Sequence, residues 1–315
     1  MRDIAFRGSK NHNNYFEGWY FKCVDEQNDL IVILIPGISI FKEKTAFLQY
    51  IIYYKTHTAS GFLKYDIDDF KITEPFGIKL PHGFISKEHI QLAFEDMECN
   101  LKLTDFTPLK NTVLAPSIMG FFEYLKMPCY HDIVSLNHSV TGTVLLKNER
   151  IEFNGKGYIE GDRGSSFPQF YIWAQCNNFT SQNSSLFMSV ADISTPFFKF
   201  LGHIAVYYRD GKEYRFASYA GSRAKVDVSA DKTSARIEFT NGSYCLKIAL
   251  EADKGNPLIA PMNRAMDFKI KEQVKAKVKI DFEKTGVEKA DAVLHTDRSE
   301  FCACEIVNWN TGCNT

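Results

Sequence analysis

Tight-turn dipeptides that separate short apolar segments recur along this chain. Asp210-Gly211 stands between HIAVYYR and KEYRFASYA, Asn241-Gly242 stands between ARIEF and SYCLKIAL, and Asn154-Gly155 follows RIEF. Such dipeptides favour the two-residue turns of β-hairpins. Because convincing amphipathic helices are few, the sequence predicts an all-β chain of antiparallel strands rather than alternating β and α units.

The hydrophobic pattern between these turns is that of strands. Residues 30–35 and 47–54 are continuous apolar runs, as expected where both faces of a strand are covered. Apolar residues alternate with lysines over 274–280, which predicts one buried and one solvated strand face. Segments 84–105 and 187–192 fit the same scheme. We therefore interpret these lysines as a solvated face and not as a nucleic-acid site.

The chain length of 315 residues favours two domains, because single hydrophobic cores rarely grow to that size. A Pro- and aromatic-containing connector occupies residues 107–127, and the Gly-rich segment GKGYIEGDRG begins at Gly155. We predict an N-terminal barrel over residues 1–155 and a C-terminal barrel over residues 156–315. Each half has the length of a small antiparallel barrel of about eight strands, which can enclose one ligand.

Charge and composition restrict the partner. Lys and Arg total 37 against 38 for Asp and Glu, so a net charge of −1 gives no global field that attracts nucleic acid or an anionic membrane. The longest apolar run, residues 30–40, is interrupted by Pro36 and Gly37, and no signal-peptide segment precedes it. Eight scattered cysteines without a CxxC pair predict free thiols. We expect a cytoplasmic protein with no integral membrane segment and an apolar small molecule as partner.

Two segments carry more polar, aromatic and glycine residues than a core strand needs. They are YFEGWYFKC, residues 15–23, and GYIEGDRGSSFPQFYIWAQCNNF, residues 157–179. On a strand, Glu17 and Trp19 share one face, whereas Tyr20 and Lys22 share the other. One face of the first segment therefore carries a carboxylate beside an indole.

These segments belong to a longer series of motifs. YFEGWYFK, MPCYHDIVSLNHSVTG, GYIEGDRGSSFP followed by YIWAQCNNF, and PLIAPMNRAM resemble, in this order, the motifs of the tocopherol cyclase family. The resemblance spans nearly the whole chain. It implies two tandem lipocalin-like β-barrels related to carotenoid hydratases and to fungal pericyclase-type cyclases. It also implies a reaction without a cofactor, in which proton-assisted addition of a phenol hydroxyl to the alkene of a prenylated quinol closes a chromanol ring.

Such chemistry requires a general acid, a shield for the cation that forms, and hydrogen bonds to the quinol. A carboxylic acid with a raised pKa can protonate the alkene. The candidates for this catalytic role are Glu17, Glu160 and Asp162. The aromatic residues suited to stabilise the cation are Trp19, Tyr20, Tyr171 and Trp173. The residues suited to orient the hydroxyl groups are Lys22, His131, Ser166, Gln175 and Asn177.

Each acidic candidate also has a structural interpretation. Glu17 is placed to pair with Lys22 or Arg163, and the acids of the Gly-rich segment are placed to accept hydrogen bonds from the amides of a turn. Tryptophans such as Trp19 and Trp173 more often fill a barrel core than line a ligand site.

A metal site is not expected. Cys129, His131 and His138 are residues of the right type, but they lack a fourth ligand and the spacing of zinc sites.

One position departs from the family pattern. Members usually read Glu-Lys-Asp/Asn-Trp-Gly where this chain reads EGDRG over residues 160–164, so Arg163 replaces a tryptophan. If this position lines the pocket, the arginine makes the site more polar than a prenylquinol requires. The sequence thus supports a cyclase, or a related isomerase or hydratase. The alternatives are a lipocalin-like carrier without catalysis and a structural scaffold with a collapsed pocket.

Overall fold

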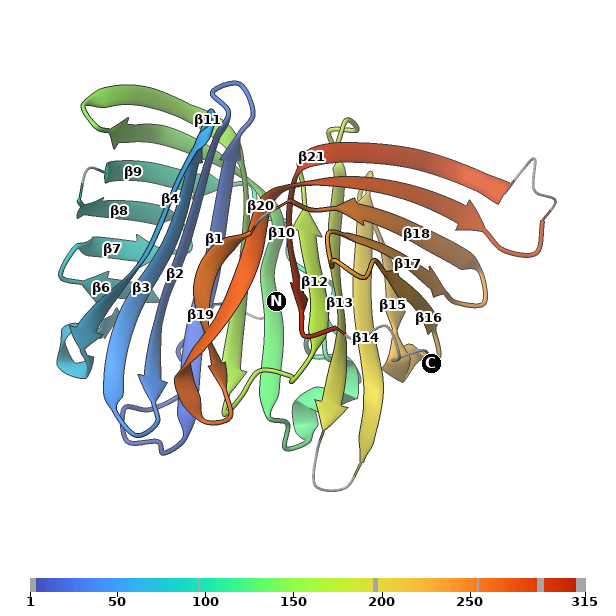
Figure 1. Cartoon of the computed structure of the whole chain (residues 1–315), viewed down its shortest axis with the longest axis horizontal. Helices are drawn as coiled ribbons and strands as arrows, with labels where there is room; N and C mark the ends of the chain where they lie inside the picture. The colour runs from blue at the N-terminus through green and yellow to red at the C-terminus, as the bar shows by residue number, and fades with distance from the viewer. Residues whose placement is uncertain (1–3, 96, 195–197, 254, 288–291, 310–315) are drawn as a thin grey trace. The chain divides into compact units, whose positions relative to one another are not determined.

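The computed structural model describes residues 4–95, 97–194, 198–253, 255–287 and 292–309. The chain forms two compact units (Figure 1). The first comprises Met1–Phe167 and Leu258–Lys269, and the second comprises Pro168–Pro257 and Ile270–Thr315. The boundary predicted after residue 155 falls inside a strand of the first unit, because residues 149–164 pair with strands on both sides.

The first unit is built on one antiparallel sheet with the order β4-β3-β2-β1-β11-β10-β9-β8-β7-β6-β5. Its strands are β1 (Tyr15–Asp25), β2 (Leu30–Ile40), β3 (Lys44–Tyr54), β4 (His57–Asp66), β5 (Lys71–Thr73), β6 (Gly77–Leu80), β7 (Gly83–Ser86), β8 (His89–Phe94), β9 (Met97–Thr104), β10 (Cys129–Leu146) and β11 (Glu149–Gly164). Two 3-10 helices, η1 (Ile67–Asp69) and η2 (Gly120–Tyr124), interrupt it.

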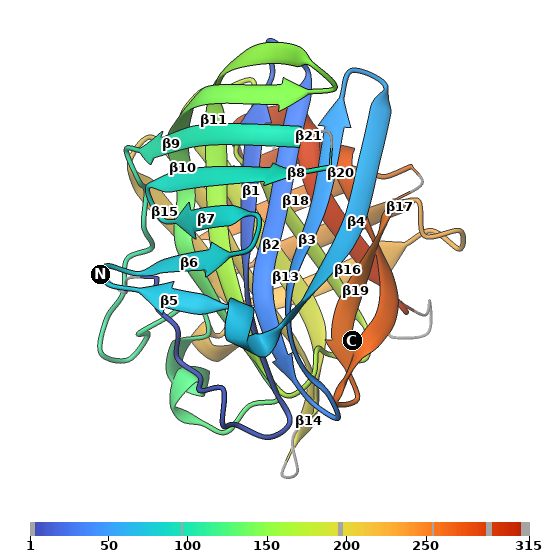
Figure 2. The ribbon, with the colours of Figure 1, turned by 90° about the vertical axis from the view of Figure 1, so that its left-hand side faces the viewer.

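This sheet curls around a single core. Figure 2 shows the short strands β5 to β9 crossing over the long strands β1 to β4. Leu48 of β3 and Ile78 of β6, near opposite ends of the strand order, belong to the same buried cluster. A sheet whose distant strands share one apolar interior is barrel-like, as the hydrophobic runs of β2 and β3 predict.

The second unit is built on another antiparallel sheet, with the order β15-β14-β13-β12-β21-β20-β18-β17-β16. Its strands are β12 (Tyr171–Cys176), β13 (Ser184–Ser194), β14 (Lys199–Arg209), β15 (Lys212–Ala217), β16 (Arg223–Val228), β17 (Ser234–Thr240), β18 (Tyr244–Glu251), β20 (Ala265–Lys284) and β21 (Val293–Val307), with the 3-10 helix η3 (Ser218–Ala220). A second buried cluster, which includes Ile172 and Phe239, fills its interior. The predicted all-β fold with two antiparallel sheets is confirmed.

A hairpin from late in the sequence returns to the first unit. β19 (Asn256–Met262) pairs with β20, and residues 258–269 of this hairpin group with the first unit. There the side-chain amide of Gln49 accepts from the N–H of Ile259 at 2.7 Å and donates to its C=O at 2.9 Å. Gln49 is buried, so these bonds replace those it would make with water.

Two of the three predicted turns are confirmed, and one is wrong. Asp210-Gly211 joins β14 to β15, and the turn at Asn241-Gly242 joins β17 to β18. Gly155 instead lies within β11, because the preceding turn is made by Lys147 and Asn148 with φ of 47° and 70°. A glycine is required there because the backbone of β1 comes close: a Cβ at position 155 would lie 1.9 Å from the carbonyl oxygen of Val24. Among the described helices, none is long and apolar enough to span a membrane.

Candidate functional site

Strand β11 places the acidic candidates on one face of the first sheet. Side chains alternate along a strand, so Tyr158, Glu160 and Asp162 point away from the core that Ile159 enters. The expected Gly-rich turn is absent here, because β11 continues to Gly164 with β1 and β10 on its two sides. Glu160 is buried and Asp162 is half-buried.

Strand β10 adds a histidine between the two carboxylates. His131 lies opposite Asp162 in the register, and its Nδ1 is 2.7 Å from Oδ1 of Asp162. Its Nε2 is 3.3 Å from Oε2 of Glu160, and the hydroxyl of Tyr158 donates to that same oxygen at 2.5 Å. The side chains of His131, Glu160 and Asp162 are 14%, 6% and 22% exposed. We call these four residues the His131 cluster.

Burial and charge act against each other in the protonation of this cluster. Burial lowers the pKa of His131, but the carboxylates of Asp162 and Glu160 raise it, and the pKa ends well above its ordinary value. Burial is the largest influence on Glu160 and raises its pKa; His131 lowers it, and the net shift is upward. The pKa of Tyr158 is raised by burial and by the carboxylate of Glu160. Both shifts favour the protonated forms of His131 and Glu160.

The same side chains could bind a metal ion, since one ligand atom of each of His131, Glu160 and Asp162 lies within 4.8 Å of the others. The two carboxylates, however, contact opposite nitrogens of the imidazole ring. Catalytic zinc sites have three protein ligands converging on one point, which this arrangement does not provide. The geometry fits an imidazolium that is hydrogen-bonded to Asp162 and lies beside the carboxyl group of Glu160.

Two predicted residues of β1 lie on the same face as the His131 cluster. Tyr20 is opposite Glu160 in the register, and its ring centroid is 6.3 Å from that of Tyr158 in an edge-to-face arrangement. Lys22 is opposite Tyr158 and is fully buried. The structure thus brings Tyr20 and Lys22 together with Glu160, Asp162 and His131.

Glu17 lies on the opposite face of β1 and is not part of this cluster. Its carboxylate accepts hydrogen bonds from the backbone N–H groups of Arg7 and Gly8, at 2.9 and 2.8 Å, and from the hydroxyl of Tyr15 at 2.7 Å. Burial raises the pKa of Glu17, and these bonds partly lower it again. Glu17 was expected to pair with Lys22 or Arg163. Lys22 lies on the opposite face of β1, whereas Arg163 is opposite Glu17 in the register and its charge lowers the pKa of Glu17.

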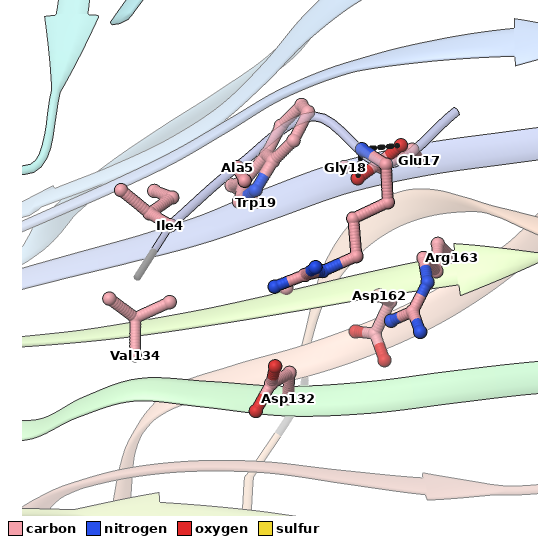
Figure 3. Close-up of a pocket in the computed structure, with 11 residues that line it drawn as sticks. Ile4, Ala5, Glu17, Gly18, Trp19, Asp132, Val134, Asp162 and Arg163 are labelled. Atoms are coloured by element: carbon pink, nitrogen blue, oxygen red, sulfur yellow. Dashed lines mark hydrogen bonds between the residues drawn. The ribbon is translucent and has the colours of Figure 1, made fainter. Parts of the chain in front are cut away.

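Trp19 lies on the Glu17 side of the sheet, in an aromatic group. Its ring stacks on Phe70 at 6.3 Å and contacts Phe76 at 5.3 Å and Phe6 at 6.4 Å. The cavity beside it, shown in Figure 3, has a volume of about 20 Å³. Such a volume has room for a single water molecule. Trp19 therefore packs in the core here, as its structural interpretation predicts.

The remaining predicted residues fall in two places. Ser166 belongs to the first unit, where its hydroxyl accepts from the N–H of Asn263 at 3.0 Å and donates to the C=O of Phe167 at 2.9 Å. The residues of the second unit are Tyr171, Trp173, Gln175 and Asn177, all of which are buried. Within that unit, the first three share the face of β12 away from its core, and the hydroxyl of Tyr171 donates to Glu305 at 2.6 Å.

With this geometry established, the family can be assigned. The model of the tocopherol cyclase-like family matches residues 104–307. The chain belongs to the tocopherol cyclase-like family. This match includes β10, β11 and the whole His131 cluster, and it confirms the resemblance seen in the motifs. No curated protein matches the chain in sequence.

Solved structures share the tocopherol cyclase-like fold of this chain. A protein of Nitrosomonas europaea assigned as AttH is 14% identical, with a TM-score of 0.58 and 98% of each chain covered. CghA bound to Sch210972 is 9% identical, and kievitone hydratase from Nectria haematococca is 8% identical. Their TM-scores are 0.53 and 0.51, and each covers 93% of this chain and 88% of its own. At these identities the likeness establishes the fold.

In this tocopherol cyclase-like chain, Arg163 forms a polar anchor. Its Nη2 is 2.6 Å from Oε1 of Glu123 in η2, and its guanidinium lies 4.6 Å from the ring centroid of Tyr130. The second oxygen of Glu123 accepts from the hydroxyl of Ser117 at 3.0 Å. The arginine therefore joins the connector between β9 and β10 to β11, next to Asp162.

Tyr158 and Glu123 were not expected at the site. Tyr158 stands two residues before Glu160 in β11, so the two side chains share a strand face. It was not identified from the sequence because the segment was interpreted as a turn. Glu123 contacts Arg163 across 40 residues of sequence, and no periodicity or motif indicates such a pair.

Proposed function

We propose that the protein is an acid–base enzyme that protonates the alkene of an apolar small molecule and lets an oxygen nucleophile capture the cation. The observation that carries this proposal is the buried imidazole of His131 between the carboxylates of Glu160 and Asp162. General acid catalysis needs a proton donor with a pKa near the working pH. The raised pKa of Glu160 and of His131 supports that role.

Each member of the His131 cluster has a different part in the proposed reaction. Glu160, the most buried of the three titratable groups, donates its proton to the alkene carbon. His131 holds the carboxyl group of Glu160 in place, with Nε2 3.3 Å from its Oε2. Asp162 orients the imidazole through its contact with Nδ1.

The proposed substrate is a prenylated quinol. Its phenol oxygen attacks the tertiary cation, the new C–O bond closes a ring, and the phenol proton returns to the carboxylate of Glu160. No electrons are gained or lost, so the net reaction is an isomerisation. The rings of Tyr20 and Tyr158 are suited to stabilise the cation. We place the substrate on this face because the groups that would transfer the proton lie there.

The test is turnover of a prenylated quinol by wild-type protein and by Glu160→Gln. The amide keeps the shape of the side chain but has no transferable proton, so we expect kcat to fall by roughly 10² to 10⁴ with quinol affinity and melting temperature retained. In D₂O, the wild-type product should carry one deuterium at the former alkene carbon.

Glu17→Gln is the matched control, since it changes a buried carboxylate on the opposite face. It should keep the turnover of the wild type. Equal turnover by Glu160→Gln and wild type would reject Glu160 as the donor. A wild-type protein that binds the quinol without converting it would instead be a lipocalin-like carrier.

A further inference from the structure

The connector between β9 and β10 presents large apolar side chains to solvent. Val113 and Leu114 are 84% and 81% exposed, and Phe121, Tyr124 and Leu125 are 46%, 64% and 40% exposed. Among the described residues, these are five of the nine exposed large hydrophobic side chains, and they lie within 13 consecutive positions. We call them the connector patch. Exposed apolar residues that cluster in this way mark interaction surfaces, whereas single ones do not.

The two halves of the connector patch lie side by side. Phe121 and Tyr124 are three residues apart in the 3-10 helix η2, so their side chains project from the same side of it. The hydroxyl of Tyr124 donates to the C=O of Val113 at 2.7 Å, which brings η2 next to the loop that carries Leu114. Ile118 and Met119 between them are buried and anchor the connector in the first unit.

The exposed charged residues of the connector itself, residues 107–127, are lysines. Lys110 and Lys126 are exposed and flank it in the sequence. Glu123 is the one acidic residue of segment 107–127, and its side chain is 6% exposed and paired with Arg163. The chain as a whole carries a net charge of −1, so any attraction to an anionic surface must be local to such a patch.

We propose that the connector patch docks on the surface of an anionic lipid bilayer. Apolar and aromatic side chains that enter the headgroup region, with lysines beside them, are the features of interfacial membrane binding. A tyrosine with a polar tip, such as Tyr124, suits the same interface. A stable dimer would need 20–30 residues from each copy, which is far more than this patch offers.

Docking would bring the bilayer close to the candidate site. The backbone N–H of His131 donates to Sδ of Met119, and Arg163 bonds Glu123, so the connector is fixed to β10 and β11. The inference goes beyond the proposed function and does not require it, because membrane binding and turnover are measured separately. If both hold, an apolar substrate dissolved in lipid would enter next to the His131 cluster.

Co-sedimentation with vesicles tests the docking. Wild-type protein should pellet with vesicles of phosphatidylcholine and phosphatidylserine and remain largely in solution with phosphatidylcholine alone. Leu114→Asp should lower the partition coefficient at least roughly tenfold, because it removes the contribution of a buried leucine side chain and adds a like charge to the anionic surface. Lys126→Glu should lower binding to the anionic vesicles only.

Leu294→Asp is the matched control, since Leu294 in β21 is 49% exposed and outside the patch. It should bind as the wild type does. Failure of the wild type to pellet with either vesicle, or equal losses in Leu114→Asp and Leu294→Asp, would overturn the proposal. So would reversible self-association that Leu114→Asp abolishes without any vesicle binding, because the patch would then join two copies of the chain.

Discussion

Removal of the Arg163 guanidinium should cost far more stability than removal of a surface ion pair. The side chains of Arg163 and Glu123 are only 15% and 6% exposed, and their charged atoms are 2.6 Å apart. Arg163→Met keeps much of the apolar stem but removes the counter-ion of the buried Glu123, whose second oxygen accepts from the hydroxyl of Ser117. A buried charge without its counter-ion is strongly unfavourable.

The expected loss follows from two contributions. Breaking a buried ion pair from one side costs about 3 to 5 kcal/mol. The same variant loses the contact of Arg163 with the ring of Tyr130, which is worth about 0.5 to 2 kcal/mol. Part of this energy is already included in the cost of breaking the ion pair. Adding Glu123→Gln removes the stranded charge, so the double variant should regain about 2 kcal/mol relative to Arg163→Met.

Urea unfolding measures this change. The three tryptophans are Trp19, Trp173 and Trp309, and only Trp19 belongs to the first unit. Replacing Trp173 and Trp309 by phenylalanine lets the fluorescence of Trp19 report the unfolding of the unit that contains Arg163. This separation matters because a chain of two units need not unfold in one step.

The exposed pair of Arg150 and Glu152 is the control. Its side chains are 68% and 75% exposed at 3.1 Å, so Arg150→Met should leave the urea midpoint unchanged. If Arg163→Met lowered the free energy of unfolding by less than about 1 kcal/mol, the ion pair would not be acting as a buried one, and the reasoning would be refuted.

The two remaining predictions concern pH and packing. The pKa of His131 is raised in the folded state, so its stabilising contribution is complete below about pH 6.5 and is lost as the pH rises through the folded pKa. His131→Asn should abolish this fall in melting temperature at high pH. Burial lowers the pKa of His138 to about 3, so His138→Asn should change only the acid limb below about pH 6.5, and identical profiles for both variants would contradict these signs. Gly155→Ala should destabilise the chain by about 1 to 3 kcal/mol, since the new Cβ meets the carbonyl of Val24. Gly242→Ala, with no atom within 4 Å of its Cβ, is the control, and equal melting temperatures for the two alanine variants would argue against the clash.

Local patterns predicted most of the fold. The alternating segment from Val274 to Ile280 forms part of strand β20, with its apolar residues buried and its lysines on the other face. The turn at Asp210-Gly211 was predictable because its positive φ angles favour these residues. The turn predicted at Gly155 was wrong because a glycine is found both where φ is positive and where another strand comes too close for a side chain.

The candidate site was predictable only in part. Glu160, Asp162 and His131 were identified as chemically suitable, but the motif gave no reason to place His131 between the two carboxylates. That placement depends on the register of β10 with β11, which shifts at irregularities between Ile133 and His138. The separation of Glu17 from the other acids depends on which strand face meets the core, and this is a property of the packed sheet.

The return of residues 258–269 to the first unit affects how such a chain can be divided. Each unit is a compact body, yet neither corresponds to one uninterrupted stretch of sequence. A cut anywhere between residues 167 and 258 would separate Gln49 from the backbone groups of Ile259 that satisfy its buried amide. Because the division between the units falls at three places in the sequence, exchange of one whole unit between relatives would require three crossovers.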